Sequence, residues 1–499
     1  MRYLISLLIS YAIGNLFLNI IFKKEHRLNN YLHFFLALGT GIAFSTQILF
    51  YGFVVFNQLN KPAMILAHFI FLLILFFVHF HLNFKKINRW LADKGLFRMQ
   101  WDIPINLYLV LITLMFLATI AQAYFYPMGG WDAWSAWNLK ARFLFLGKTH
   151  WRNLLDPILW RSSPHYPLLL PLTDVWSWIF GENPEPAGPL VVSLVFSFMT
   201  AGLVFAGLIP KALQKNPRMT TDTDTPQKSK ENKSQITTSK TKEFLLRFHF
   251  SLDPSAFWAC LATLLMICLP FFTKLASSQY CDIVLAYYLL GTLMCLILAR
   301  STGVKSSAFM AGLFLGFLSF TKTEGMSAAV IIFIFSLPYL FLRKKPVGQQ
   351  VLIIFFLIGL GLGVLPTVIF QKFYSPGNQT FIHGLTSTVK PANLFRLKMI
   401  LSFLLVEMVS AKWNGLWLIL LIGIILTKGN AFHSLVRIVP VFLFSYLLMI
   451  GTYYYLNTYF DIGWWLKVSL NRILFGNLPT AVFWVFSSIG KEEKDDGPP

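Results

Sequence analysis

Long apolar runs recur along most of the chain and are separated by short polar segments. Two of them, "LVLITLMFLATIAQAYF" and "VLIIFFLIGLGLGVLPTVIF", approach the roughly 20 residues that cross the hydrocarbon core of a bilayer. Backbone polar groups cannot stay unpaired in hydrocarbon, so runs of this length predict helices. The pattern therefore predicts an all-α integral membrane protein, built as a bundle of about 12–13 transmembrane helices.

The composition agrees with this class, because 56% of the 499 residues are hydrophobic and only 13% are charged. These are the proportions of a lipid-embedded chain rather than of several soluble domains. Hydropathy predicts spans near residues 2–22, 31–56, 62–82, 103–125, 186–209, 256–272, 282–299, 306–320, 325–342, 349–371, 413–427, 433–456 and 473–490.

Basic residues are concentrated in every second polar segment between the predicted spans. The segments "KKEHR", "KKINRWLADKGLFR", 210–250, "RSTGVK", "RKKPVGQ", "KGNAFHSLVR" and the tail hold 26 of the 42 Lys and Arg. The positive-inside rule assigns them to the cytoplasm and residues 126–185 to the opposite side. The net charge of +21 is thereby explained by orientation, and we expect no nucleic-acid partner.

One polar segment divides the chain. Residues 215–243 alternate charge with Ser, Thr and Asn and offer almost nothing that could build a core, which predicts disorder. The expected parts are N-terminal membrane helices (1–102), membrane helices with a large extracytoplasmic loop at 126–185 (103–210), a disordered cytoplasmic linker (211–250), a C-terminal helix bundle (251–490) and a polar tail (491–499).

The outer loop 126–185 is rich in tryptophan. It contains seven of the 15 tryptophans of the chain: Trp131, Trp134, Trp137, Trp151, Trp160, Trp176 and Trp178. An aromatic belt at the membrane interface would need such residues. A sugar or lipid-phosphate site would also use them, because indole faces cover the C–H faces of a pyranose. The sequence leaves both interpretations open.

Within this loop, "GGWDAWSAWNLKAR" predicts a short helix along the membrane surface. Its apolar residues Trp134, Trp137 and Ala141 recur at three- and four-residue spacing after a glycine pair. Asp132 falls in the first turn, where a carboxylate either complements the helix dipole or serves as a general base. Downstream, His165 and Tyr166 in "RSSPHYPLLLP" are candidates for ligand contact, although no second histidine lies at metal-ligand spacing.

Further charges lie at the outer ends of other spans. Asp282 begins one span in "YCDIVLAYY", Lys322 and Glu324 form the turn "TKTEG", and Arg472 follows "WWLKVSLN". Ionisable groups at the ends of apolar helices are often functional, because a desolvated charge is expensive unless it is paired. Helix capping and snorkelling are the structural alternatives for these residues.

Four stretches together resemble a known family. They are "GGWDAWSAWNLKAR" with "HYPLLLP" downstream, "YCDIVLAYY", "GLFLGFLSFTKTEG" and "WWLKVSLNRIL", spread over residues 103–475. In this order the chain resembles the GT-C membrane glycosyltransferases, in the branch of bacterial protein O-mannosyltransferases and aminoarabinose transferases (family 39, RgtA/B/C/D-like). It departs from the family pattern at Asn471, where an Asp is expected, and at His165, where an acid is common.

The resemblance implies an inverting transfer of a sugar from a polyprenyl-phosphate donor. The acceptor would be an envelope glycolipid, a polysaccharide or a protein on the outer side of a bacterial inner membrane. Asp132 matches the presumed catalytic base of the family, and Asp282 matches the acid of a second loop. The substrate-binding residues expected around these two acids are Trp131, Trp134, Lys140, Arg142, His165, Tyr166, Lys322, Glu324 and Arg472.

Physical considerations agree with this expectation. The leaving lipid phosphate needs cations, and Arg is best suited to bidentate contact with it. The sequence leaves open whether a divalent metal ion bridges Asp132 and Asp282, and we expect no other cofactor.

The alternative from a different class is a transporter or flippase of lipid-linked saccharides, which would also have many spans and a cationic cavity. Acids and aromatics gathered on one side only, and the lack of charges in mid-span, favour the transferase. A scaffold for envelope assembly would leave the placement of Asp132 and Asp282 unexplained.

Overall fold

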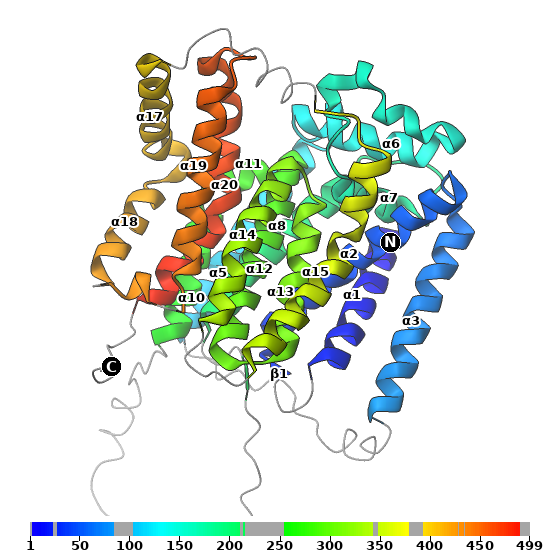
Figure 1. Cartoon of the computed structure of the whole chain (residues 1–499), viewed down its shortest axis with the longest axis horizontal. Coiled ribbons are helices and arrows are strands. Elements are labelled where there is room, and N and C mark those ends of the chain that lie inside the picture. Colours follow the sequence, from blue (N-terminus) through cyan, green and yellow to red (C-terminus); the bar gives the residue numbers. More distant parts are fainter. Residues whose placement is uncertain are drawn as a thin grey trace, which may run out of the picture.

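The computed structural model describes residues 2–22, 27–83, 103–209, 213–214, 254–342, 348–378, 393–427, 429–433 and 435–489. Within these ranges the regular secondary structure is helical apart from one antiparallel pair of two-residue strands, β1 (Arg27–Leu28) and β2 (Leu213–Gln214). The long helices run side by side as a bundle (Figure 1). Most of the linker predicted at 211–250, and the tail 491–499, lie outside the described residues.

Nine helices of the described chain are long and apolar enough to cross a membrane. They are α1 (Arg2–Ile21), α2 (Asn30–Phe56), α3 (Lys61–Asn83), α5 (Ile103–Phe125), α8 (Ala187–Leu208), α12 (Cys281–Thr302), α14 (Thr323–Phe341), α15 (Gln349–Phe373) and α19 (Ile438–Leu456). This confirms a helical, multi-pass membrane protein. A tenth span results if α10 (Pro254–Ile267) and α11 (Pro270–Ser278), bent by 68° at the intervening break, count as one.

Other predicted spans take a different form. The apolar helices α13 (Lys305–Ser319) and α18 (Leu416–Leu426) have only 15 and 11 residues. The segment predicted at 473–490 belongs to the longer α20 (Ile462–Ser488), whose outer half is polar enough to keep it from the nine. Hydropathy missed α17 (Leu394–Met408) because charged residues interrupt its apolar face.

The loop at 126–185 folds into short helices, as the sequence predicts. They are a π-helix (Ala133–Trp137), α6 (Asn138–Leu146), the 3₁₀-helices η4 (Lys148–Leu155) and η5 (Pro157–Ser162), and α7 (Leu169–Trp178). All ten residues of α7 are buried, so this helix packs inside the bundle rather than on the membrane surface. Two further 3₁₀ turns are η6 (Ala411–Trp413) and η7 (Asn430–Phe432).

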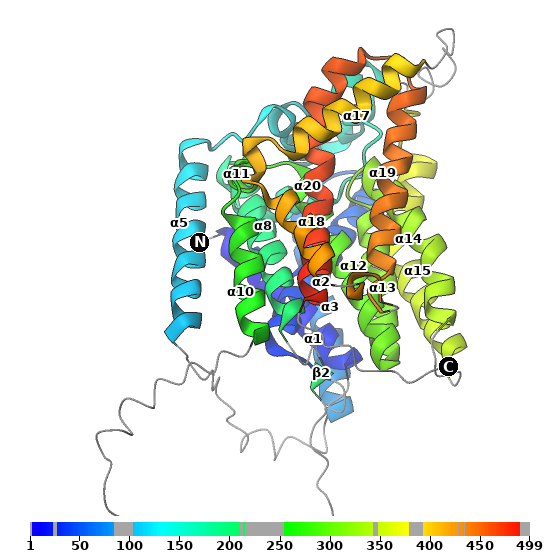
Figure 2. The ribbon, with the colours of Figure 1, turned by 90° about the vertical axis from the view of Figure 1, so that its left-hand side faces the viewer.

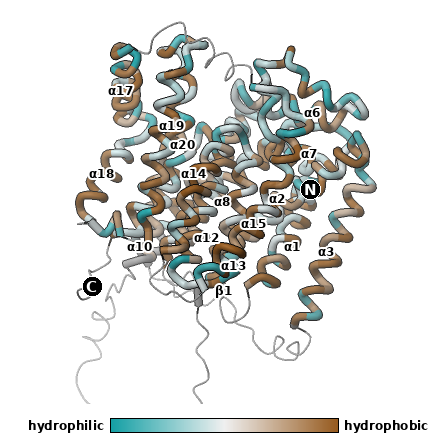
Figure 3. The backbone as a smooth tube through the Cα atoms, viewed as in Figure 1, coloured by the Kyte–Doolittle hydropathy of each residue, from teal (hydrophilic) through white to brown (hydrophobic). Residues whose placement is uncertain are grey.

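The two ends of the bundle differ. Figure 1 shows α6 and α7 at the upper end, and β1 with the lower ends of the helices at the other. Arg2 lies at the upper end with the loop, where its guanidinium is 3.8 Å from Glu185. Turned by 90°, the bundle has α17 running obliquely across the top and α5 at one edge (Figure 2). Apolar colours dominate the long helices, and polar colours gather over the α6 region (Figure 3).

Helix α12 forms the centre of the bundle and packs against α8, α13 and α20. In its most apolar stretch 89% of the residues are buried, compared with 11% for α5. A peripheral helix with so little buried surface must find its apolar neighbours in the membrane. The central position of α12 matters for function, because this helix begins with Asp282.

Glycines allow α13 and α15 to approach closely. Gly312 and Gly316 on α13 face Gly359 and Gly363 on α15, each pair at four-residue spacing. A Cβ built on Gly312 would lie 1.9 Å from the carbonyl oxygen of Phe356. Small residues at such spacing let membrane helices pack backbone to backbone, so these positions tolerate no side chain.

We predict that Gly359→Leu destabilises the fold and that Gly361→Leu, two residues away on α15, does not. A Cβ on Gly359 would lie 2.0 Å from the Phe309 carbonyl oxygen, whereas one on Gly361 has no neighbour within 4 Å. Overpacking of this kind costs about 1–3 kcal/mol or more. Thermal unfolding in detergent checks the pair, and equal midpoints would contradict the packing described here.

Candidate functional site

The start of the outer loop is fixed to the turn between α11 and α12. The amide of Gly130 donates to the Ser278 carbonyl at 3.0 Å. The side chain of Gln279 donates to the Pro127 carbonyl at 2.8 Å and accepts from the Asn138 amide at 2.7 Å. Loop residues 127–138 are therefore held directly above the N-terminus of α12.

A chain of ion pairs joins four separate elements at this point. Arg472 on α20 donates from Nη1 to Asp132 at 2.5 Å and from Nε to Asp282 at 2.9 Å. The second oxygen of Asp282 accepts from Lys322 at 2.7 Å, and Lys322 also lies 3.3 Å from Glu324. All five charged residues of this network were candidates from the sequence. The structure brings them together from as far apart as 340 positions along the chain.

Asp282 is the buried centre of the network. Its side chain is 2% exposed, and both oxygens are bonded to cations. It also lies in the first turn of α12, where the helix dipole stabilises a negative charge. Burial would lower the pKa of Lys322, but Asp282 and Glu324 outweigh burial and hold the pKa above its usual value. The distances and burial are those of a structural ion pair.

Asp132 has a different environment. Its side chain is 33% exposed. Among the residues that the structure describes, only Oδ2 has a bonding partner, which leaves Oδ1 available to accept. The carboxylate stands at the start of the π-helix but makes no capping hydrogen bond to it. Tyr280 fixes the position, since its hydroxyl accepts from the Asp132 amide at 3.4 Å and its ring lies 4.7 Å from the Arg472 guanidinium.

A cavity of about 190 Å³ opens beside this network. Its charged lining comes from Asp132, Arg161, Lys322, Glu324 and Arg472, and its aromatic lining from Trp137, Tyr166 and Trp465. Pockets for small molecules usually measure roughly 300–1,000 Å³, so this cavity is smaller than a typical complete ligand site. The π-helix that carries Trp137 is a feature found often at functional sites.

Trp137 and Tyr166 form an aromatic wall of the cavity, and Lys140 lies behind it. Its side chain is buried, donates to the Ser163 carbonyl at 2.6 Å and lies 5.4 Å from the ring centres of Trp137 and Tyr166. Burial lowers the pKa of the Lys140 ammonium to about 7. Lys140 supports the wall rather than lining the cavity.

His165 contacts the same wall. Burial, with a smaller contribution from Lys140, lowers the pKa of the His165 imidazole to about 4, so the ring is neutral at neutral pH. The ring packs edge-on against Tyr166, and the backbone carbonyl accepts from Gln371. These contacts are those of a local packing residue.

Three further residues expected to bind substrate, like Lys140 and His165, are not part of the cavity lining. Trp131 and Trp134 are 66% and 50% exposed and pack against each other with ring centroids 4.3 Å apart. Arg142 is exposed and does not line the cavity. The exposed indoles fit the interfacial belt, and Trp137 alone of the three closely spaced tryptophans faces inward.

Eight residues of the lining were not selected from the sequence, among them Trp137, Arg161, Trp465 and Ser469. A signal for two of them was present, because Trp465, Ser469 and Arg472 are spaced by four and three residues and share one face of α20. Arg161 gave no such signal, since it lies in an irregular stretch of the loop.

The sequence left open whether a metal ion bridges Asp132 and Asp282, and the geometry of the two carboxylates addresses this question. The guanidinium of Arg472 lies between Asp132 and Asp282 and bonds to both, so a divalent ion has no place between them in this arrangement. In the described ranges, no group of three or more His, Cys, Asp or Glu side chains is arranged to hold a metal.

Comparisons of the chain with protein-family models, with curated proteins and with solved structures found no match. The site must therefore be interpreted from its own geometry and from the resemblance of its motifs.

We predict that Asp282→Asn destabilises the protein far more than Asp132→Asn. Removing one partner of a buried ion pair costs about 3–5 kcal/mol, because Lys322 and Arg472 would be left with uncompensated charge. A partly exposed pair contributes under about 1 kcal/mol. Unfolding free energies in mixed micelles check the difference, and equal losses would show that Asp282 is not the structural centre.

A second prediction concerns Lys140 and pH. The folded pKa near 7 lies below the unfolded value near 10.4, so between these pH values the unfolded chain binds the extra proton. Stability contributed by this group therefore rises with pH from about 7 to 10, by up to about 1.4 kcal/mol per unit. We expect Lys140→Met to remove this rise, measured as unfolding midpoints across that range. The exposed Lys148→Met is the control, and an unchanged pH profile in Lys140→Met would refute the prediction.

Proposed function

We propose that the chain is an inverting glycosyltransferase of the GT-C type. It would move a sugar from a polyprenyl-phosphate donor to a hydroxyl of an envelope glycolipid, a polysaccharide or a protein. The reaction would take place at the outer face of a bacterial inner membrane. The observation that carries the proposal is the half-paired carboxylate of Asp132, which lines a cavity whose other charges are mainly cations.

In the proposed reaction Asp132 is the general base. Its free Oδ1 accepts the proton of the acceptor hydroxyl while the hydroxyl oxygen attacks the anomeric carbon from the face opposite the phosphate. The bond between that carbon and the phosphate oxygen breaks, and polyprenyl phosphate leaves with the electron pair. Attack from the opposite face inverts the anomeric configuration.

Arg472 is suited to hold the leaving phosphate. A guanidinium has five N–H donors, and in this structure two point to Asp132 and Asp282. Three remain for phosphate oxygens, and Lys322 and Arg161 add positive charge along the same cavity. Electrostatic stabilisation of the developing charge is usually the largest contribution to catalysis. Asp282 then acts as a positioning residue, because it fixes both Arg472 and Lys322.

The arrangement of helices is consistent with this assignment. If α13, α18 with α17, α20 and the bent pair α10–α11 also cross the membrane, they join the nine long helices to give 13 spans. This number falls within the 12–13 expected from the sequence. The short helices after α5 would then form the extracytoplasmic loop that characterises GT-C enzymes, with the N-terminal Arg2 on the same side.

We predict that cells lacking the protein lose one sugar from an envelope glycan, detected by mass spectrometry of extracted glycolipids. Wild-type protein should restore it. Asp132→Asn should lower the transfer rate by about 10²- to 10⁴-fold because the general base is removed. Glu182→Gln, which changes an exposed acid of the same loop, is the matched control and should restore the sugar fully.

If Asp132→Asn at normal protein level restored the sugar fully, the catalytic assignment would be wrong. Reconstituted vesicles address the transport alternative. Protein-dependent flipping of lipid-linked sugars that persists in Asp132→Asn would favour a flippase over the transferase.

A further inference from the structure

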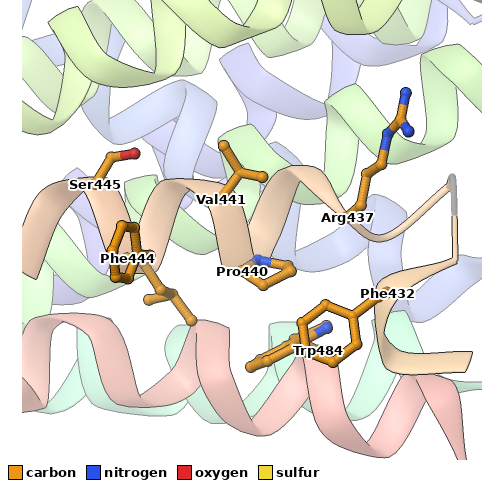
Figure 4. Close-up of a pocket in the computed structure, with 8 residues that line it drawn as sticks. Phe432, Arg437, Pro440, Val441, Phe444, Ser445 and Trp484 are labelled. Atoms are coloured by element: carbon orange, nitrogen blue, oxygen red, sulfur yellow. The ribbon is translucent and has the colours of Figure 1, made fainter. Parts of the chain in front are cut away.

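A second concave site lies at the opposite end of the bundle from Asp132. It is a groove of about 510 Å³ between the first half of α19, the 3₁₀ turn η7 and the last turns of α20. Its lining is almost entirely apolar, with Phe432, Val441 and Phe444 exposed at 57%, 39% and 70%. Arg437 and Phe432 lie at one end of the groove and Phe444 at the other (Figure 4).

The floor of the groove is rigid. The indole of Trp484 on α20 is buried, and its N–H donates to the Ala431 carbonyl at 2.6 Å. The ring of Phe432 packs edge-on against it at 5.9 Å. Because the polar edge of Trp484 is already bonded, the surface that it offers to the groove is apolar.

Arg437 is the charged group of the groove. It is exposed and makes no side-chain hydrogen bond or ion pair with the residues that the structure describes. The neighbouring Arg300 differs, because its guanidinium donates to the carbonyls of Tyr339 and Leu342 at the end of α14. Tyr339 in turn donates its hydroxyl to the Leu435 carbonyl, which fixes the segment before Arg437. A free guanidinium is thus held at the mouth of an apolar groove.

We propose that this groove binds one phospholipid with an anionic head group. The phosphate would pair with Arg437, and an acyl chain would lie along Val441 and Phe444 over the Trp484 ring. From Arg437 to Ser445 the groove follows α19 for about 12 Å, a length suited to a chain rather than to a compact solute. The groove lies on the outside of the bundle, where membrane lipids are the neighbours.

The position along the membrane supports the same ligand. The positive-inside rule assigns the end of the bundle at 428–437 to the cytoplasm, and the cytoplasmic leaflet carries the anionic lipids. Trp484 lies 12 residues beyond Arg472 on α20, or about 18 Å along the helix. The groove is therefore separate from the reacting cavity, and the proposal does not depend on the transferase function.

Native mass spectrometry of the full-length protein tests the proposal. Phosphatidylglycerol should remain bound at lower concentration than phosphatidylcholine with the same chains. Arg437→Gln should weaken phosphatidylglycerol binding about fivefold, the ratio expected for one basic residue at an anionic surface, and weaken phosphatidylcholine binding less, because choline offsets the charge of its phosphate. Arg437→Lys should largely restore it. Lys305→Gln, an exposed cation at the same end of the bundle, is the matched control.

A second arm tests the apolar part. Val441→Trp should fill the groove and reduce binding of both lipids, and Ser445→Phe serves the same purpose if the first variant fails to fold. Equal binding of the two lipids by the wild type would overturn the proposal, as would equal losses in Arg437→Gln and Lys305→Gln. Displacement of phosphatidylglycerol by millimolar glycerol 3-phosphate would also overturn it, because the site would then recognise a soluble anion.

Discussion

The burial of Asp282 is the constraint on which the upper end of the bundle depends. An isolated carboxylate there would be costly, so it must be paired and hydrogen-bonded. The two cations that pair with it come from the α13–α14 turn and from α20, and neither is close to it in sequence. Burial of α12 at the centre of the bundle therefore requires Lys322 and Arg472 to lie beside Asp282. The ion pairs select one arrangement of these helices among the many that an apolar bundle allows.

This constraint divides the two acids into different roles. Both contact Arg472, but one is enclosed with every oxygen bonded and the other borders the cavity with one oxygen free. Asp282 bonds to both Arg472 and Lys322 and so holds Arg472 in place. From this position Arg472 bonds to Asp132 while Asp132 remains at the cavity surface. The guanidinium that bonds to Asp132 also faces the cavity, so in the proposed reaction one side chain would position both the base and the leaving phosphate.

Much of this could be predicted from the sequence. Hydropathy found most long helices, and the charge count assigned Asp132, Asp282, Lys322, Glu324 and Arg472 to one side. Their meeting could not be predicted, since no spacing rule connects residues hundreds of positions apart. The sequence also did not predict that Trp134 and Trp137 point in different directions, and the reason is local. A regular 3.6-residue period groups Trp134 with Trp137, but the π-turn at Ala133–Trp137 changes the phase, so that only Trp137 turns inward.

Helix α20 connects the end of the bundle that holds the ion pairs to the end that holds the apolar groove. Its inner half is buried almost without interruption from Leu474 to Ser488 and packs on α12 and α8. Phe475 contacts Phe271 and Phe272 of α11, the helix whose end holds the outer loop in place. The position of Arg472 is therefore set by close packing just below it, where neither charge nor solvent contributes. Apolar packing at this depth thus fixes the geometry of the ion pairs, and the ion pairs in turn determine which carboxylate keeps one oxygen facing the cavity.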